Sequence, residues 1–321
     1  MTTSITSTCA CGSFSLKVDY PNNTLPIDRG FCLCNSCRRL TGSCGISYIL
    51  APSKQPIDIT KFELTSYEST DRLTRYFCPT CGCHGLVKVS HNQAWHLATG
   101  PLDRTEGIVN WLNCKWVEDT LDGGISVWLK EIVGPDGKKK PIPRYMLQDW
   151  NNGALVPDDI PLNVLPEEKK ALTDPNKLEA QCHCGGVKFY ITRPNEESKK
   201  AQSPFPDLMV PYHSHSSENP TNETWWLRDN DTKYLAGTCT CRSCRAASGF
   251  EIQPWVSFAF SQLTFYQQCP IVLGYCALNV SQFLGYCAPD QILQWCADFD
   301  FFDFLGIYSK MQYLHGRWIA H

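Results

Sequence analysis

Three cysteines and two arginines stand together in the segment CLCNSCRR at residues 32–39. Cys32, Cys34 and Cys37 fall within six positions, a spacing that lets their thiolates meet at one metal ion. A structural zinc site takes four ligands, whereas a catalytic zinc site takes three from the protein and keeps one position open. The segment is therefore either part of a closed site or a complete open one.

A fourth ligand is available nearby in Cys44, which would close the site. A second copy of the motif tests this interpretation, because residues 30–42 read GFCLCNSCRRLTG and residues 237–249 read GTCTCRSCRAASG. The second copy keeps the trio Cys239, Cys241 and Cys244, but Glu251 stands where Cys44 would be. A carboxylate can also bind zinc, so the closed site stays an alternative. Because only the trio is shared, we favour an open site.

Four further cysteines form two pairs with the spacing of a structural zinc site. Cys9 and Cys11 lie in CACG, and Cys78 and Cys81 lie in YFCPTCGCH. Together they supply four sulfurs for one tetrahedral zinc, the alternative being reduced cysteines in the core. Cys182 and Cys184 repeat the first pair in CHCG, but no CxxC follows them. We therefore expect an incomplete site there, because the spacing of the later cysteines, Cys269, Cys276, Cys287 and Cys296, is not that of a zinc knuckle.

The charged and imidazole side chains beside these cysteines have two interpretations. Arg38 and Arg39, like Arg242 and Arg245 in the second copy, favour deprotonated thiols and suit the carboxylates of a thiol substrate. They would otherwise be ordinary solvated charges. His84 follows Cys83 in CGCH, and for both a packing or surface role is the simpler interpretation because four ligands exist without them.

The segments between the motifs indicate which elements carry them. FSLKVDY, GISYILA, KFELTSYES, RLTRYFC and HGLVKVS are short, rich in β-branched or aromatic residues, and bounded by turn residues. The repeated order of motifs predicts a duplicated module. We expect a mainly β protein with a first domain at 1–134, a linker rich in proline and charge at 135–178, and a second domain at 179–321. Its motif set is lost beyond about residue 260, so the second domain is incomplete at its C-terminal end.

Composition limits the classes of protein that the chain can belong to. The 321 residues carry a formal net charge of −3, which argues against a dedicated nucleic-acid binder. The start MTTSITSTCACG has no basic and apolar regions of a secretory signal, so the 19 cysteines are expected in a reducing compartment, the cytoplasm or the nucleus. The uncharged stretch IVLGYCALNVSQFLGYCA is long enough to span a membrane, but its polar centre predicts that it does not.

The order CxCG, CxCxxCRxxxG and FCxxCG resembles that of the glutathione-dependent formaldehyde-activating enzyme family, which includes centromere protein V. The resemblance covers residues 5–130 well and 179–260 in part, and the pairing of domains is similar to that in fungal members. It implies a β-tent fold for each domain. It also implies a structural zinc at Cys9, Cys11, Cys78 and Cys81 and a catalytic zinc at Cys32, Cys34 and Cys37, with a further zinc at Cys239, Cys241 and Cys244.

The activity implied by the resemblance is the addition of glutathione's thiol to formaldehyde, a reversible carbon–sulfur lyase reaction of the S-(hydroxymethyl)glutathione synthase type. The expected partners are a small thiol and a small aldehyde. One alternative is a zinc module that binds partners without catalysis. Another is redox chemistry at a cysteine outside the zinc shells, for which Cys44, Cys83 and Cys114 are the candidates in the first domain.

Overall fold

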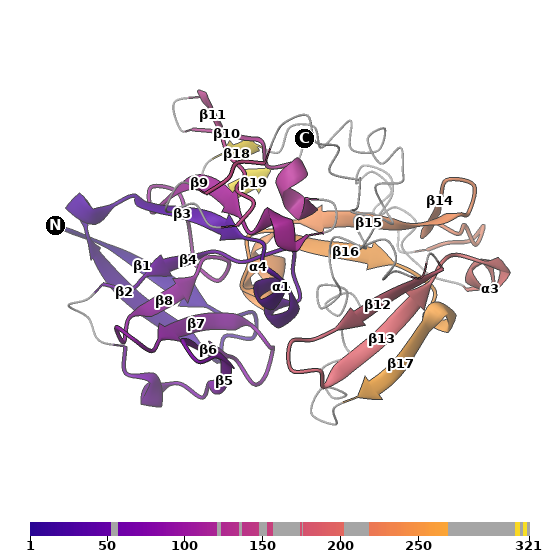
Figure 1. Cartoon of the computed structure of the whole chain (residues 1–321), viewed down its shortest axis with the longest axis horizontal. Coiled ribbons are helices and arrows are strands. Elements are labelled where there is room, and N and C mark those ends of the chain that lie inside the picture. The colour runs from indigo at the N-terminus through magenta and orange to yellow at the C-terminus, as the bar shows by residue number, and fades with distance from the viewer. Residues whose placement is uncertain are drawn as a thin grey trace.

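The computed structural model describes residues 1–52, 57–120, 123–134, 137–147, 153–156, 174, 176–201, 218–268, 312–314 and 317–319. Strands dominate and helices are few and short, which confirms the prediction of a mainly β protein (Figure 1). The described strands gather around two hydrophobic cores, which we use to define a first unit, residues 1–156, and a second unit, residues 177–268.

The first unit contains a hairpin, a five-stranded antiparallel sheet and a parallel pair. Strands β1 and β2 form the hairpin, the sheet has the order β4-β8-β7-β6-β5, and β3 runs parallel to β9. Its elements are β1 (Thr2–Thr8), β2 (Ser15–Pro21), η1 (Asn22–Thr24), β3 (Ile27–Cys32), α1 (Asn35–Thr41), β4 (Tyr48–Leu50), η2 (Ile59–Lys61), β5 (Thr65–Thr70), β6 (Leu73–Phe77), β7 (His84–Val89), β8 (Trp95–Ala98), β9 (Val109–Lys115), η3 (Val117–Asp119), η4 (Gly124–Val127), β10 (Glu131–Val133) and β11 (Lys139–Pro141).

The hairpin illustrates how the sequence pattern produces these strands. Ile5 on β1 pairs with Val18 on β2, and both side chains are fully buried while their neighbours along the strands are more exposed. This alternation is that of a sheet with one face against the core. Gly12, with φ of 81°, allows the left-handed turn that reverses the chain between the two strands. The turn carries Cys9 and Cys11, so the hairpin fixes the first cysteine pair.

The second unit repeats part of this plan. Its sheets have the orders β12-β13-β17 and β14-β15-β16. The elements are β12 (Lys177–Gln181), β13 (Val187–Thr192), α3 (Glu196–Lys199), β14 (Leu227–Arg228), β15 (Lys233–Cys239), α4 (Arg242–Ser248), β16 (Gln253–Ser257), η6 (Phe260–Gln262) and β17 (Leu263–Gln268). Outside both units, β18 (Gln312–Leu314) pairs with β19 (Arg317–Ile319). As in the first unit, a hairpin carries the CxC pair and a strand leads into a short helix at the trio.

The first unit extends beyond the boundary expected at residue 134. Strand β11 pairs with β10, although it falls in the segment expected to be a linker. Ile142 and Val156 are buried in the first hydrophobic core. The composition of this segment is rich in proline and charge, but its few apolar side chains are enough to attach it to the core. The described part of the expected linker therefore packs on the first unit as far as Val156.

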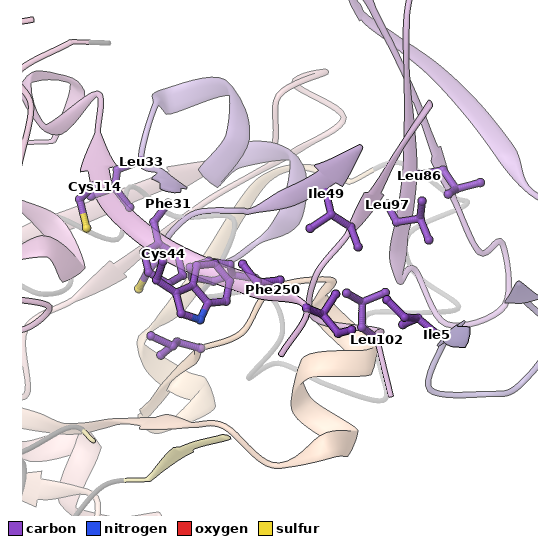
Figure 2. Packing of buried hydrophobic residues seen from close by; sticks show 14 of the residues in the cluster. Ile5, Phe31, Leu33, Cys44, Ile49, Leu86, Leu97, Leu102, Cys114 and Phe250 are labelled. Atoms are coloured by element: carbon purple, nitrogen blue, oxygen red, sulfur yellow. The ribbon is translucent and has the colours of Figure 1, made fainter. Parts of the chain in front are cut away.

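The core of the first unit also receives side chains from the second (Figure 2). Phe250 and Ile252 are fully buried within it. The Phe250 ring meets Phe31 edge to face, with ring centroids 5.8 Å apart, and Phe31 stacks on Trp111 at 4.4 Å. The two units consequently share apolar packing. In Figure 1, α1 and α4 lie in the middle of the molecule, between the strands of the first unit and the sheet of β12, β13 and β17.

Two expectations fall on segments outside the described residues. The apolar stretch at 271–288 and the cysteines from Cys269 onward belong to these segments. Within the described part of the chain, no helix has the length and apolar character needed to cross a membrane.

Candidate metal centres

The structure brings the first two cysteine pairs together. The sulfurs of Cys9, Cys11, Cys78 and Cys81 all lie within 4.8 Å of one another. Cys11 Sγ is 3.5 Å from both Cys9 Sγ and Cys78 Sγ. Four thiolates around zinc, each about 2.3 Å from the metal, would stand about 3.8 Å apart at the corners of a tetrahedron. The donor set and its spacing therefore fit a closed zinc site.

Backbone turns hold these thiols in place. Phe14 N donates to Cys9 Sγ at 3.3 Å, and Gly12 N donates to Cys9 O at 3.1 Å. In the other pair, Gly82 N donates to Cys78 O at 2.9 Å, with Gly82 at φ of 72°. Amide N–H groups directed at sulfur stabilise a thiolate and orient it toward a metal. The first turn thus favours a thiolate at Cys9, and the second fixes the backbone that carries Cys78 and Cys81.

The trio is built where a strand ends and a helix begins. Strand β3 ends at Cys32, and Cys34 is the N-cap of α1, its sulfur accepting a hydrogen bond from Cys37 N at 3.4 Å. Helix α1 ends at Gly42, whose φ of 64° is the left-handed conformation that glycine adopts readily. The three sulfurs lie within 4.8 Å of one another. Three converging thiols at one point fit an open zinc site.

Neither candidate for a fourth ligand joins a trio. Cys44 is only 1% exposed and packs in the hydrophobic core of the first unit. In the second unit, Glu251 Oε2 is 3.3 Å from Arg245 Nη1, and both side chains are buried. Within the chain segments that the structure describes, each of these two possible metal sites consists of its three cysteines, with no further ligand group beside them. This favours the open site over the closed alternative.

A buried hydrogen-bond network on the five-stranded sheet contacts Cys37. The guanidinium of Arg75, on β6, donates from Nη2 to Cys37 Sγ at 3.6 Å and from Nε to Ser69 Oγ at 3.0 Å. Its Nη1 donates to Tyr48 Oη. The Tyr48 hydroxyl is therefore left to donate to His84 Nε2, 2.6 Å away. A chain of hydrogen bonds thus leads from His84 through Tyr48 and Arg75 to a trio sulfur.

The electrostatics of the trio favour a thiolate at Cys37. Hydrogen bonds from Cys32 and Cys34 lower the pKa of the Cys37 thiol, and the Arg75 guanidinium lowers it further. The hydrogen bond that Cys32 makes with Cys34 raises the pKa of Cys32 in turn. Burial lowers the pKa of His84 to about 3, and the charge of Arg75 acts in the same direction. His84 is consequently neutral near pH 7 and can accept the Tyr48 hydrogen bond.

The two arginines that follow the trio lie in different surroundings. Arg38 is 1% exposed, and its guanidinium donates to Leu33 O at 2.8 Å, Asn35 Oδ1 at 2.7 Å and Asp119 O at 2.9 Å. It braces the loop between β3 and α1. Arg39 is partly exposed. The CRR pattern could not distinguish these surroundings, because both residues follow the same cysteine.

The second unit reproduces the trio but offers only one other cysteine pair. Cys239, Cys241 and Cys244 converge within 4.8 Å, and Cys241 caps α4 as Cys34 caps α1. A hydrogen bond from Cys244 lowers the pKa of Cys239 to about 5. Cys182 and Cys184 have sulfurs 3.3 Å apart, and the described residues place no further ligand group with them.

The cysteines considered for redox chemistry are all buried. Cys44, Cys83 and Cys114 are at most 1% exposed. Burial raises the pKa of the Cys83 thiol, and it raises that of Cys114 to about 12. Reactive cysteines are accessible and have low pKa values. These surroundings argue against the redox alternative.

Sequence reasoning missed the residues of the buried hydrogen-bond network that ends at Cys37. Arg75, Tyr48 and Ser69 are brought to Cys37 by the five-stranded sheet, and His84 had been assigned to packing or the surface. One signal was present in RLTRYFC, where Arg75 takes the central position of β6 and is the only residue of that strand that is buried. A buried charge in a strand requires a partner.

These features define a class of protein: a mainly β, cysteine-rich module that combines a four-thiol cluster with a three-thiol cluster. Residues 4–117 match the family model described as "Glutathione-dependent formaldehyde-activating enzyme". The match supports the family membership that the motifs of this part of the chain predicted. A comparison with curated proteins finds no match for the chain.

Proposed function

We propose that the protein is a zinc-dependent carbon–sulfur lyase of the S-(hydroxymethyl)glutathione synthase type, which adds a glutathione-like thiol to a small aldehyde such as formaldehyde. The observation that carries the proposal is the trio at Cys32, Cys34 and Cys37, whose three sulfurs converge without Cys44. The family name of residues 4–117 supports the choice of glutathione and formaldehyde. On this proposal, Cys9, Cys11, Cys78 and Cys81 hold a structural zinc.

The proposed reaction forms one bond and moves one proton. The sulfur of the thiol bonds to the aldehyde carbon, the carbon–oxygen double bond becomes single, and the thiol proton ends on the oxygen. Zinc held by three thiolates would leave one position for the incoming sulfur and favour it as a thiolate. No strong base from the protein is then required.

The residues around the trio have separate parts in this proposal. Arg75 donates to Cys37 Sγ and is held by Ser69 and Tyr48, so it keeps that sulfur deprotonated and oriented. Arg39, partly exposed at the end of α1, is assigned to a carboxylate of the thiol substrate. The trio of the second unit is proposed as a further zinc site, and the second unit as a duplicate of the first.

The activity can be tested by NMR exchange between formaldehyde and its glutathione adduct. We expect the full chain to accelerate the exchange above the rate in buffer, and Cys34→Ser to lose both the acceleration and one zinc per chain. Cys44→Ala is the matched control, which should keep its zinc because Cys44 lies in the core. If the wild-type chain holds zinc but leaves the exchange rate unchanged, the lyase proposal fails in favour of a binding module.

A further inference from the structure

The two copies of the motifs contact each other in a reciprocal pattern. Ala10 N donates to Ala246 O at 3.1 Å, and His183 N donates to Arg39 O at 3.3 Å. Ala10 and His183 are the middle residues of CAC and CHC, while Arg39 and Ala246 each stand two positions after the last cysteine of a trio. The same contact is therefore made twice, once in each direction.

A second pair of contacts follows the same rule. Ser43 Oγ donates to Ile252 O at 2.9 Å. Phe250 packs against Gly45, where an added Cβ would lie 3.5 Å from Cζ of the ring. When the trios are aligned, Ser43 corresponds to Phe250 and Gly45 to Ile252. Contacts exchanged in this way are those of a two-fold symmetric interface. The two units are thus related by an approximate two-fold axis that passes near these segments.

The crossed hydrogen bonds end the helices that carry the trios. Helices α1 and α4 have seven residues each, and the carbonyls of a helix's last turn find no partner within the helix. His183 N satisfies the Arg39 carbonyl of α1, and Ala10 N satisfies the Ala246 carbonyl of α4. Each helix begins at one cysteine of its trio and contains another. A CxC turn of one unit therefore fixes the far end of the trio helix in the other.

The turn at Cys182–Cys184 is held in its docking position from both units. Val187 N donates to Cys182 Sγ at 3.2 Å, as Phe14 N does to Cys9 Sγ in the first unit. The His183 ring lies 2.9 Å, Nδ1 to Oη, from Tyr67 on β5. The turn keeps this form although the described residues offer it no second cysteine pair.

Backbone contact at the interface leaves little room for movement. A Cβ added at Gly100 would stand 2.5 Å from Gly249 C and 2.8 Å from Arg245 O. Gly100 N also donates to Gly249 O at 3.3 Å. The C-terminal end of α4 is thus pressed directly against the first unit, which makes the caps sensitive to a shift of either unit.

We propose that the two units are the halves of an internal pseudo-two-fold dimer in which each CxC turn holds the trio helix of the other unit, so that metal retention in one unit depends on the other. The inference rests on the zinc sites of the proposed function and goes beyond them. It gives the Cys182–Cys184 turn a role as the cap of α1. That role needs the backbone amide of His183, not a complete metal site.

Two proline variants of the full chain remove the capping amides one at a time. His183→Pro deletes the donor to α1, and Ala10→Pro deletes the donor to α4. The controls His183→Asn and Ala10→Ser keep the amides, and Asn also keeps a polar group for the contact with Tyr67. Purified zinc-loaded protein is challenged with a chelator. Alkylation followed by peptide mass spectrometry then reports which cysteines have lost protection, independently of any activity.

The expected result is a crossed pattern. His183→Pro should speed the loss of protection at Cys32, Cys34 and Cys37 about fivefold, the factor that one backbone hydrogen bond contributes to an equilibrium constant. Ala10→Pro should do the same at the trio of α4. The inference is overturned if each proline affects only the cysteines of its own unit, or if His183→Asn matches His183→Pro. Zinc missing from the first trio of the wild type would instead refute the proposed function.

Gly100→Ala decides the question if the proline variants do not fold. The added methyl group pushes α4 away without touching a cysteine, and Ser66→Ala, at an exposed position of β5, is the control. We expect Cys239, Cys241 and Cys244 to lose protection faster while the four-thiol cluster stays protected. Unchanged protection of the α4 trio would refute the cross-capping.

Discussion

Replacement of Arg75 by methionine tests the buried network behind the trio. The change keeps an unbranched side chain of similar length but removes the cation that donates to Cys37 Sγ at 3.6 Å. We expect the trio to bind zinc more weakly, because the negative charge of its thiolates loses its nearest buried partner. The four-thiol cluster should bind zinc as before, since the contacts of Arg75 are to Cys37, Ser69 and Tyr48.

The size of the effect follows from the geometry. At 3.6 Å, Coulomb's law with an effective dielectric constant of about 20 gives an attraction of about 5 kcal/mol. This is an upper value, because desolvation of the buried guanidinium opposes it. Hydrogen bonds to charged groups contribute about 1.5–3 kcal/mol net. We therefore expect a loss of about 2 kcal/mol, which is about a thirtyfold decrease in the zinc affinity of the trio.

The assay is a chelator competition on the full chain, with alkylation of cysteines to assign each zinc to its site. Arg72→Met is the matched control, because the Arg72 side chain lies in the same hairpin but is 77% exposed beside Asp71. The reasoning is refuted if the two variants retain zinc equally at the trio. A loss confined to the four-thiol cluster would refute it as well, since it would indicate general damage to the hairpin.

Two further predictions concern stability. The pKa of His84 is about 3 in the folded chain, so below about pH 6.5 the unfolded chain binds a proton that the folded chain does not. His84 therefore lowers the free energy of unfolding as the pH falls from about 6.5 toward 3, by up to about 1.4 kcal/mol per pH unit. His84→Gln should reduce this pH dependence, measured by urea unfolding at a series of pH values. A pH dependence equal to that of the exposed-site control His91→Gln would contradict the assignment. Phe250→Ala should lower the free energy of unfolding by about 3–5 kcal/mol, because it empties a buried ring site shared by both units. Denaturant titration measures this free energy. An unfolding transition of the first unit that matches the wild type would show that the shared core does not couple the unfolding of the two units.

The cysteine motifs were predictable because their geometry is local. CxC, CxxC and CxCxxC each place ligands within one turn of chain, so the spacing indicated which sulfurs converge within each motif. The predominance of strands could also be read from short segments rich in β-branched and aromatic residues. The second copy of the motif, where Glu251 stands in place of Cys44, favoured a trio without Cys44.

Other features could not be predicted because they depend on sheet register and on packing between units. Arg75 reaches Cys37 only through the pairing of β6 within the sheet, which no local pattern specifies. Phe250 enters the core of the first unit from the second, across more than 200 positions from Phe31. The extension of the first unit to Val156 rests on a few apolar side chains within a polar segment.

The approximate two-fold axis has a consequence for how the protein can vary. In a dimer of identical chains, every substitution falls on both sides of the axis at once, so each must be acceptable in both places. Within one chain, a substitution falls on one side only. Arg39 and Ala246 occupy matching places beside the two trios, and so do Cys44 and Glu251. One unit can therefore keep its metal-binding residues while the other diverges, provided that the diverged unit still caps the trio helix of the first.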